Sequence, residues 1–198
     1  AAAGGAGGGL SATTIAIAGA AVAGGAVAAV EVVKKNGEGA EQQHFSGALT
    51  GSITETITNR TSGQVCVVTK NINATIRVDL DPNEPSNVQG NLGVSGNTTV
   101  TATSGGCGGV GQTNTFGGST PLSGTQASLV GSNTSTNTNT TTLGETSTVT
   151  STTAFSGAVS GSTITGTLKV ESRGTTTQST TSDSVQSGTY SITLNKTS

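Results

Sequence analysis

The sequence predicts an all-β protein, an Ig-like antiparallel β-sandwich that follows an apolar N-terminal extension. Two observations carry this prediction. The chain is rich in Thr and Val, which favour strands, and in Gly and Asn, which favour turns. From Phe45 onward, apolar and polar residues alternate in short runs that end at Gly, Asn, Asp or Pro. We therefore divide the chain into an Ala/Gly-rich extension at 1–40 and a β-sandwich domain at 41–198.

Several short segments show the alternation expected of half-buried strands. In the segment 73–80, for example, Ile76, Val78 and Leu80 share one face while polar residues share the other. The same reasoning places these residues in the core: Ile53, Ile57, Ile164, Leu168, Val170, Tyr190, Ile192 and Leu194. The expected strands are 50–58, 63–70, 73–80, 97–103, 155–161, 162–172 and 188–194. About seven strands is the usual size of a sandwich.

The region from Gly105 to Thr153 is harder to interpret because it is rich in Gly, Asn, Ser and Thr, with SNTSTNTNTTT at its centre. The simpler interpretation is a polar, low-complexity loop. The alternative is a set of Thr-rich strands whose outer face carries sugar.

Charge and cysteine content limit the environment and the partners. Charged residues make up 9% of the chain, the net charge is −2, and no basic cluster is present, so we expect no nucleic-acid partner. Low charge with many Ser and Thr residues is typical of an extracellular surface protein. Cys66 and Cys107 are the two cysteines, and an even count in such a chain favours a disulfide. Closing this loop would stabilise the fold by about 4 kcal/mol.

The stretch from Leu10 to Val30 contains no charged side chain, and Glu31, Lys34 and Lys35 end the apolar run. A signal peptide would have basic residues before its apolar centre, but no Lys or Arg precedes Lys34. The stretch is long enough to cross a bilayer as a transmembrane helix. It consists largely of Ala and Gly, however, which contribute little to membrane insertion.

The third interpretation is an extended segment that another protein buries. Strands buried on both faces are apolar without alternation, and β-branched residues favour strands over helices. Side-chain burial alone does not compensate the entropy of ordering such a segment, so it also needs a ladder of main-chain hydrogen bonds. We expect a break near Gly19 or Gly24, with one part donated to a neighbour. The residues expected to make the contact are Leu10, Ile15, Ile17, Val22, Val27, Val30, Val32 and Val33.

This layout, an apolar extension before a disulfide-closed, Thr/Gly-rich β-domain, resembles the subunits of donor-strand fibres, which include chaperone–usher pilins. Donor strands of those pilins are shorter and alternate more cleanly. The resemblance implies a structural subunit of an extracellular fibre on the cell surface, whose partners are copies of itself. Insertion of the N-terminal segment into the neighbouring subunit would join the copies head to tail, and such contacts generate open helical filaments.

Six sequons of the N-x-S/T kind are candidate glycosylation sites. Several would arise by chance in a chain this rich in Asn and Thr, but dense Ser and Thr with few charges is also typical of glycosylated stalks. We therefore expect covalent glycans and no other cofactor. The candidate sites are Asn59, Asn73, Asn97, Asn133, Asn139 and Asn195.

The sequence offers weak signals for metal binding and none for catalysis. Four oxygen donors suited to calcium lie close together, although their spacing is not that of an EF-hand. They are Asp79, Asp81, Asn83 and Glu84. GCGGVG at 106–111 matches a phosphate-binding pattern but has no helix after it. His44 is the only histidine, so we expect neither an enzyme nor a small-molecule substrate.

Two other functions remain open at this point. A membrane-anchored β-sandwich at the cell surface would use the apolar stretch as its anchor. A polysaccharide-binding module would stack sugar on aromatic side chains, of which the chain has four: Phe45, Phe116, Phe155 and Tyr190.

Overall fold

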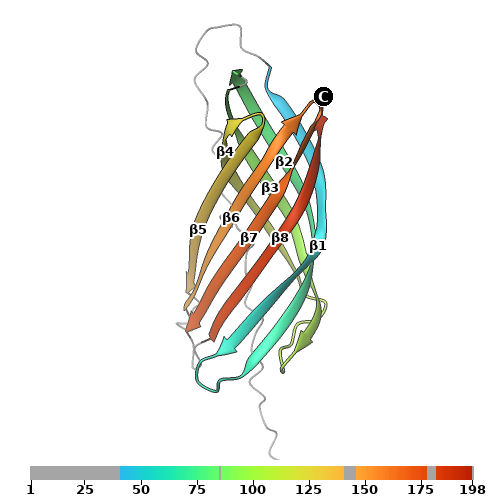
Figure 1. The fold of residues 1–198 in the computed structure, drawn as a ribbon. Helices are drawn as coiled ribbons and strands as arrows, with labels where there is room; N and C mark the ends of the chain where they lie inside the picture. The colour runs from blue at the N-terminus through green and yellow to red at the C-terminus, as the bar shows by residue number, and fades with distance from the viewer. Residues whose placement is uncertain (1–40, 85, 141–145, 178–181, 198) are drawn as a thin grey trace, which may run out of the picture.

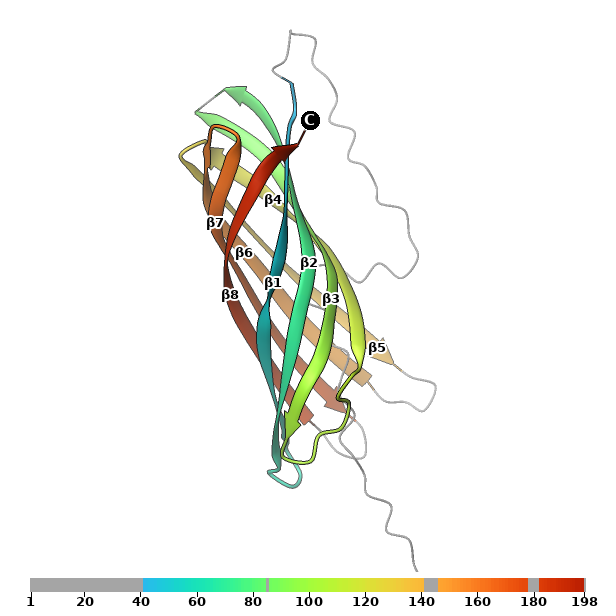
Figure 2. The same cartoon turned by 90° about the vertical axis from the view of Figure 1, so that its right-hand side faces the viewer.

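The computed structural model describes residues 41–84, 86–140, 146–177 and 182–197, which form a closed antiparallel β-barrel (Figures 1 and 2). Its strands are β1 (Gln43–Asn59), β2 (Val65–Glu84), β3 (Asn87–Ser104), β4 (Thr113–Thr125), β5 (Ser128–Thr140), β6 (Thr146–Ser160), β7 (Thr163–Thr177) and β8 (Ser182–Thr197). Each strand pairs with the next in sequence, and β8 returns to β1. The extension at 1–40, with all the residues of the expected assembly segment, lies outside the described residues.

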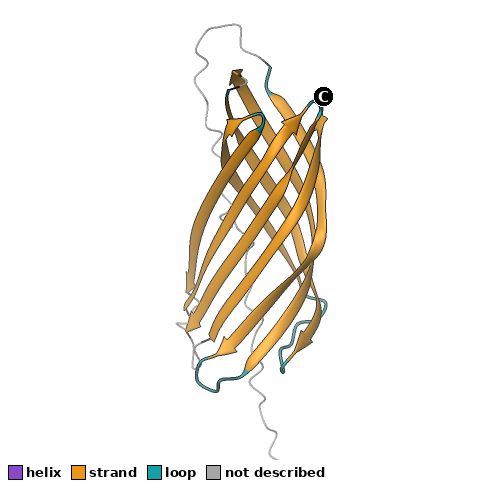
Figure 3. Ribbon diagram, in the orientation of Figure 1, coloured by secondary structure: helices purple, strands orange, loops and turns teal. Residues whose placement is uncertain are grey.

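The prediction of an Ig-like sandwich is wrong, although the all-β class is confirmed (Figure 3). Alternation shows that one face of each strand is buried, but it does not distinguish two packed sheets from one sheet closed on itself. Strand length does distinguish them here. The predicted strands at 63–70 and 73–80 belong to one continuous strand, β2, and each strand is long enough to span a barrel.

The region from Gly105 to Thr153 contains β4, β5 and half of β6. Its interpretation as a loop is therefore wrong, and the alternative of Thr-rich strands is right about the strands. Thr and Asn alternate in this region as regularly as apolar residues do elsewhere, so the period of a strand is present without its usual hydrophobicity.

The core residues predicted from alternation are buried inside the barrel, together with Phe45, Val88, Leu92, Leu122, Leu129 and Phe155. Glycines on the same inner face leave room for larger neighbours. A Cβ built on Gly51 would lie 3.0 Å from the ring of Tyr190, and a Cβ on Gly188 would overlap the same ring. Tyr190 therefore fills space that two glycines leave empty, as expected in a barrel that must be filled by its own side chains.

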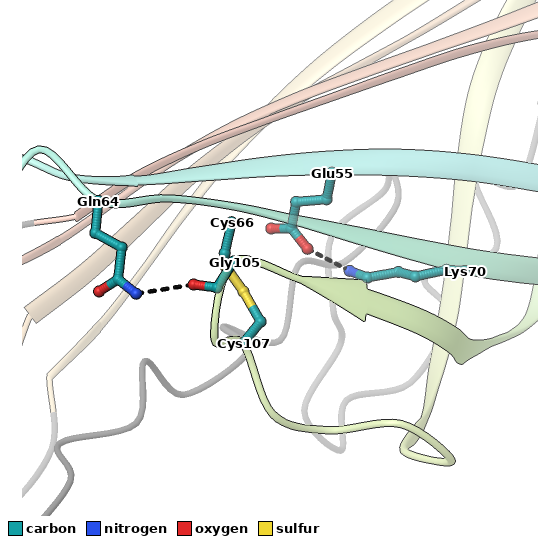
Figure 4. The surroundings of a disulfide bond; sticks show 6 residues. All are labelled: Glu55, Gln64, Cys66, Lys70, Gly105 and Cys107. Atoms are coloured by element: carbon teal, nitrogen blue, oxygen red, sulfur yellow. Dashed lines mark hydrogen bonds and ion pairs between the residues drawn. A yellow bond between two sulfur atoms is a disulfide. The ribbon is translucent and has the colours of Figure 1, made fainter.

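The disulfide between Cys66 and Cys107 is present, as predicted (Figure 4). It joins the start of β2 to the loop after β3, with 5.8 Å between the two Cα atoms. Gln64 Nε2 donates a hydrogen bond to Gly105 O beside it, at 2.8 Å. The two half-cystines belong to a second, smaller apolar cluster at this end of the barrel, with Ile57, Val68 and Val100.

The barrel closes where β1 meets β8. Pairing runs from His44↔Thr197 to Ser46↔Asn195, stops, and resumes in the same register from Thr54↔Ser187 to Asn59↔Ser182. Tyr190 Oη bridges the interruption by donating a hydrogen bond to Ser52 O at 3.2 Å. This closure is therefore held at both ends and tied in the middle.

Candidate functional site

Two features stand out in the barrel, and the first is a row of polar side chains inside it. Glu55, Gln186, Ser172, Ser151 and Ser135 are register neighbours across β1, β8, β7, β6 and β5. Together with Lys70 of β2 and Thr153 of β6, we call these residues the polar belt. All of them are buried except Ser135, which is half-buried. Polar groups at this depth require hydrogen-bond or charge partners.

Glu55 and Lys70 form an ion pair inside the barrel, with 2.7 Å between Glu55 Oε2 and Lys70 Nζ (Figure 4). Their side chains are 0% and 2% exposed. Burial raises the pKa of Glu55, while the charge of Lys70 and hydrogen bonds from Lys70 and Ser184 oppose the shift. Each charge therefore depends on the other, since neither can reach water.

Other members of the belt lack such partners. Both amide atoms of Gln186, which is 1% exposed, are buried without a hydrogen-bond partner among the described residues. The hydroxyls of Thr153 and Ser135 are likewise buried without a hydrogen-bond partner among these residues. By contrast, the hydroxyls of Ser151 and Ser172 lie 3.0 Å apart and bond to one another. The interior near β5 and β6 is therefore polar and incompletely satisfied.

The second feature is a gap in strand pairing. β4 and β5 follow one another in sequence, yet they pair only through three residue pairs, from Ser123↔Val130 to Thr125↔Ser128. Beyond this short hairpin, β4 from Thr113 to Leu122 and β5 from Gly131 to Thr140 make no pair with each other. Figure 1 shows the two strands separating below the hairpin. We call these two facing edges the β4–β5 seam.

Pro121 explains where the pairing stops. Ser119 O accepts a bond from Asn133 of β5, so the peptide group of Ser119 faces the seam. Alternate residues of a strand direct their peptide groups to the same side, so the nitrogen of Pro121 faces the seam as well. Proline has no N–H to donate, and the ladder therefore ends beside it.

Two residues of β5, Gly131 and Asn133, lie close to β4 at the hairpin end of the seam. Gly131 passes close to β4, where a Cβ would lie 2.6 Å from Leu122 Cδ2 and still closer to Pro121 O. Asn133 Nδ2 donates a bond of 2.8 Å to Ser119 O, so a side chain satisfies a main-chain acceptor that a ladder would otherwise use. The seam is thus narrow at its hairpin end.

A ladder of threonine hydroxyls stiffens the other edge of β5. On the outer face, Thr134 pairs with Thr152 and Thr136 with Thr150, with 2.9 and 3.0 Å between the hydroxyl oxygens. Two further pairs continue the ladder toward the end of β5. β5 is therefore held firmly to β6, while its other edge faces the seam.

The structure does not bring the proposed calcium ligands into a metal site. His44 Nδ1 lies 2.6 Å from Asp79 Oδ1, so an ion pair occupies the first of these carboxylates when the ring is protonated. Within the described residues, no group of three His, Cys, Asp or Glu side chains is placed to hold a metal ion. The side chains of Asn83 and Glu84 lie outside the described part.

The candidate glycosylation sites differ in accessibility. Asn73, Asn139 and Asn195 are exposed, and Asn97 is half-buried. Asn59 is buried, and its Oδ1 accepts bonds from the amides of Thr61 and Ser62. The amide of Asn133 is engaged with Ser119. The three exposed asparagines are therefore the best placed to carry a glycan.

Sequence reasoning missed the polar belt and the seam, although signals for both were present. Glu55 lies between Ile53 and Ile57 on the same face of an alternating run, which places a carboxylate in the core. Pro121 within a Thr/Gly-rich run is the mark of an edge strand. Both signals become readable only once the surrounding strands are recognised.

Comparisons with protein-family models, with curated proteins and with solved structures found no match for this chain. No helix able to cross a membrane occurs within the described ranges.

Proposed function

We propose that this protein is a structural subunit of an extracellular fibre at the cell surface. Copies would join head to tail through the apolar segment of 10–33, which one copy contributes and the next one buries. The subunit itself would carry no catalytic activity.

The observation that carries this proposal is the β4–β5 seam. Unpaired strand edges invite the addition of another strand, and most proteins cover or shorten them. Here about ten residues on each of two facing strands form no backbone pair across the seam, where the side chain of Asn133 bonds Ser119 O instead. The same chain contains a long apolar segment that needs main-chain partners, so each feature supplies what the other lacks.

The surface of the barrel supports a structural role. Its outer face is covered with Thr, Ser and Asn side chains, which suit water and could carry covalent glycans at Asn73 or Asn195. The aromatic side chains give little support to a polysaccharide-binding module. Phe45, Phe155 and Tyr190 are buried and Phe116 is half-buried, so none presents an open ring for sugar to stack on.

The test uses the full chain and a pair of matched variants. We expect the unmodified protein to form filaments that sediment and are visible by negative-stain electron microscopy. Replacing two apolar residues of the segment, Ile15→Asp with Ile17→Asp, should leave monomers, because buried carboxylates oppose insertion. Val110→Asp is the control, since Val110 is an exposed loop residue, and it should still assemble.

Two results would contradict the proposal. One is a monomer at every concentration tested, and the other is equal assembly of the Ile15→Asp, Ile17→Asp variant. Flotation of the full chain with phosphatidylcholine vesicles, lost in the same variant, would instead support a membrane anchor.

A further inference from the structure

We propose that the β4–β5 seam of one copy accepts the part of the apolar segment from 10 to 17 of a second copy, as a ninth strand. This inference rests on the proposed function and deepens it, because it names the acceptor surface, the inserted residues and the direction of insertion.

The seam offers two strand edges that form no backbone ladder with each other, with Ser119 O bonded to the side chain of Asn133. The peptide group of Ser119 faces the seam, and by the alternation of a strand those of Gly117 and Thr115 face it too. β5 is paired with β6 along its whole length, from Leu129↔Gly157 to Thr140↔Thr146, so only its seam edge is open. An inserted strand would run antiparallel to one edge and parallel to the other.

The interior behind the seam selects which part of the segment enters. Ser135 lies on β5, Thr153 lies on the adjacent β6, and both hydroxyls are buried with no hydrogen-bond partner in the described part of the chain. A donated strand that places hydroxyls there would satisfy them. In the segment from Leu10 to Val33, the hydroxyl residues are Ser11, Thr13 and Thr14, and the rest is apolar apart from Glu31. The hydroxyl-bearing start therefore fits the seam better than the later Ala/Gly/Val part.

The place where β1 begins is compatible with a second copy as the acceptor. β1 begins at the end of the barrel that also holds the β4–β5 hairpin, and the seam opens toward the opposite end (Figure 1). A copy stacked on this end would turn the open end of its seam toward the start of β1, and the 25 residues between Ile17 and Gln43 would link the two barrels. The strand would then run in the direction of β1, which is antiparallel to β4 and parallel to β5.

Photo-crosslinking of the full chain tests this arrangement. Ile15 is replaced by p-benzoylphenylalanine, and ¹⁴N- and ¹⁵N-labelled proteins are mixed before assembly, so that mass spectrometry distinguishes crosslinks between copies from those within one copy. We expect crosslinks between copies that map to β4 and β5, at Thr113–Leu122 or Gly131–Thr140. The matched control carries the same photoreactive residue in place of Val27, and its crosslinks should map elsewhere.

The other outcomes separate this inference from the proposed function. Crosslinks between copies that map to other strands would overturn the seam as acceptor and leave head-to-tail assembly standing. Crosslinks from position 27, and not from position 15, into the seam would overturn the choice of inserted residues. Crosslinks confined to single copies, with no assembly, would overturn both proposals.

A variant of the acceptor edge gives a second readout that does not depend on the photoreactive residue. Gly117→Pro removes one N–H that faces the seam, as Pro121 does naturally, without touching the pairing with β3. Loss of one main-chain bond should raise the concentration at half-assembly about five-fold. Gly108→Pro in the loop after β3 is the control and should assemble like the unmodified protein. Equal assembly of the two variants, with both folded by circular dichroism, would contradict the proposal.

Discussion

Pairing between neighbouring strands is interrupted at the β1–β8 closure and at the β4–β5 seam, and the two interruptions differ in what surrounds them. β1 and β8 lie far apart in the sequence, yet they pair on both sides of a gap, residues 47–53 of β1, that Tyr190 bridges. β4 and β5 are consecutive, yet they pair only at their hairpin. Nearness in sequence therefore does not decide the extent of pairing here.

The side chains at each interruption account for the difference. At the β1–β8 closure, an aromatic ring fills the space over Gly51 and Gly188, and the buried Glu55 pairs in register with Gln186. At the β4–β5 seam, Pro121 removes a donor, and the inner residues of β5 beyond Leu129 are small or polar. The side chains of the barrel itself fill the interruption at the β1–β8 closure. At the β4–β5 seam they leave the strand edges unpaired.

The ion pair beside the β1–β8 closure should have the largest effect on stability. Glu55→Gln leaves the charge of Lys70 uncompensated inside the barrel, so we expect a loss of about 3–5 kcal/mol in the free energy of unfolding. Urea denaturation measures it. Replacing both partners, Glu55→Leu with Lys70→Met, should recover most of the loss.

The exposed pair of Lys169 and Glu171 provides the control for this prediction, since both side chains are about half exposed. Glu171→Gln should leave the urea midpoint unchanged. A midpoint for Glu55→Gln that equals that of the unmodified protein would show that water reaches the belt.

Two glycines sharpen the contrast along the seam itself. Gly131→Ala forces a Cβ against Leu122 and Pro121, so we expect a loss of about 1–3 kcal/mol. Gly117→Ala, further down the seam, places its Cβ 3.7 Å from the nearest atom, Val94 O, and should change stability by less than about 0.5 kcal/mol. Thermal unfolding of both variants measures the difference. Equal losses would mean that the seam is closed along its length.

Restoring the missing donor tests the cause of the seam. In Pro121→Ala, the new N–H faces β5 and should extend the pairing by one hydrogen bond, which stabilises the fold by about 1 kcal/mol. Loss of the proline also increases the conformational entropy of the unfolded chain, which offsets this gain. Stability should therefore change little, while hydrogen exchange at position 121 becomes slow. An amide at this position that exchanges like one in an open loop would exclude proline as the cause.

The smallest effect concerns the ion pair of Arg60 and Asp183 near the β1–β8 closure, with 2.5 Å between Arg60 Nε and Asp183 Oδ2. The hydrogen bond from Arg60 lowers the pKa of Asp183. The pair therefore stabilises the fold above the ordinary pKa of aspartate and loses this effect as pH falls through the lowered value. We expect a small difference in Tm between the unmodified protein and Asp183→Asn at pH 6, which narrows below about pH 4. A difference that does not depend on pH would contradict this.

The sequence predicted the parts of the fold that depend on apolar alternation. Ile76, Val78 and Leu80, and the matching residues of β7 and β8, are buried as expected, and the disulfide is confirmed. Closure into a barrel was not predictable in this way, because it depends on inner-face glycines: Gly51 of β1 and Gly188 of β8 both leave room for the ring of Tyr190 of β8. β5 was missed because its inner face beyond Leu129 consists of Gly, Asn and Ser, which hydrophobic periodicity does not detect.

The wall that contains the seam has one further property. No acidic, basic or histidine side chain occurs in strands β3 to β6, so these four strands carry no side-chain charge. Added salt has no fixed charges to screen there, and acid or alkali has no group to titrate. A contact made on this wall would hold with nearly the same strength in brine, in fresh water or at an acidic surface.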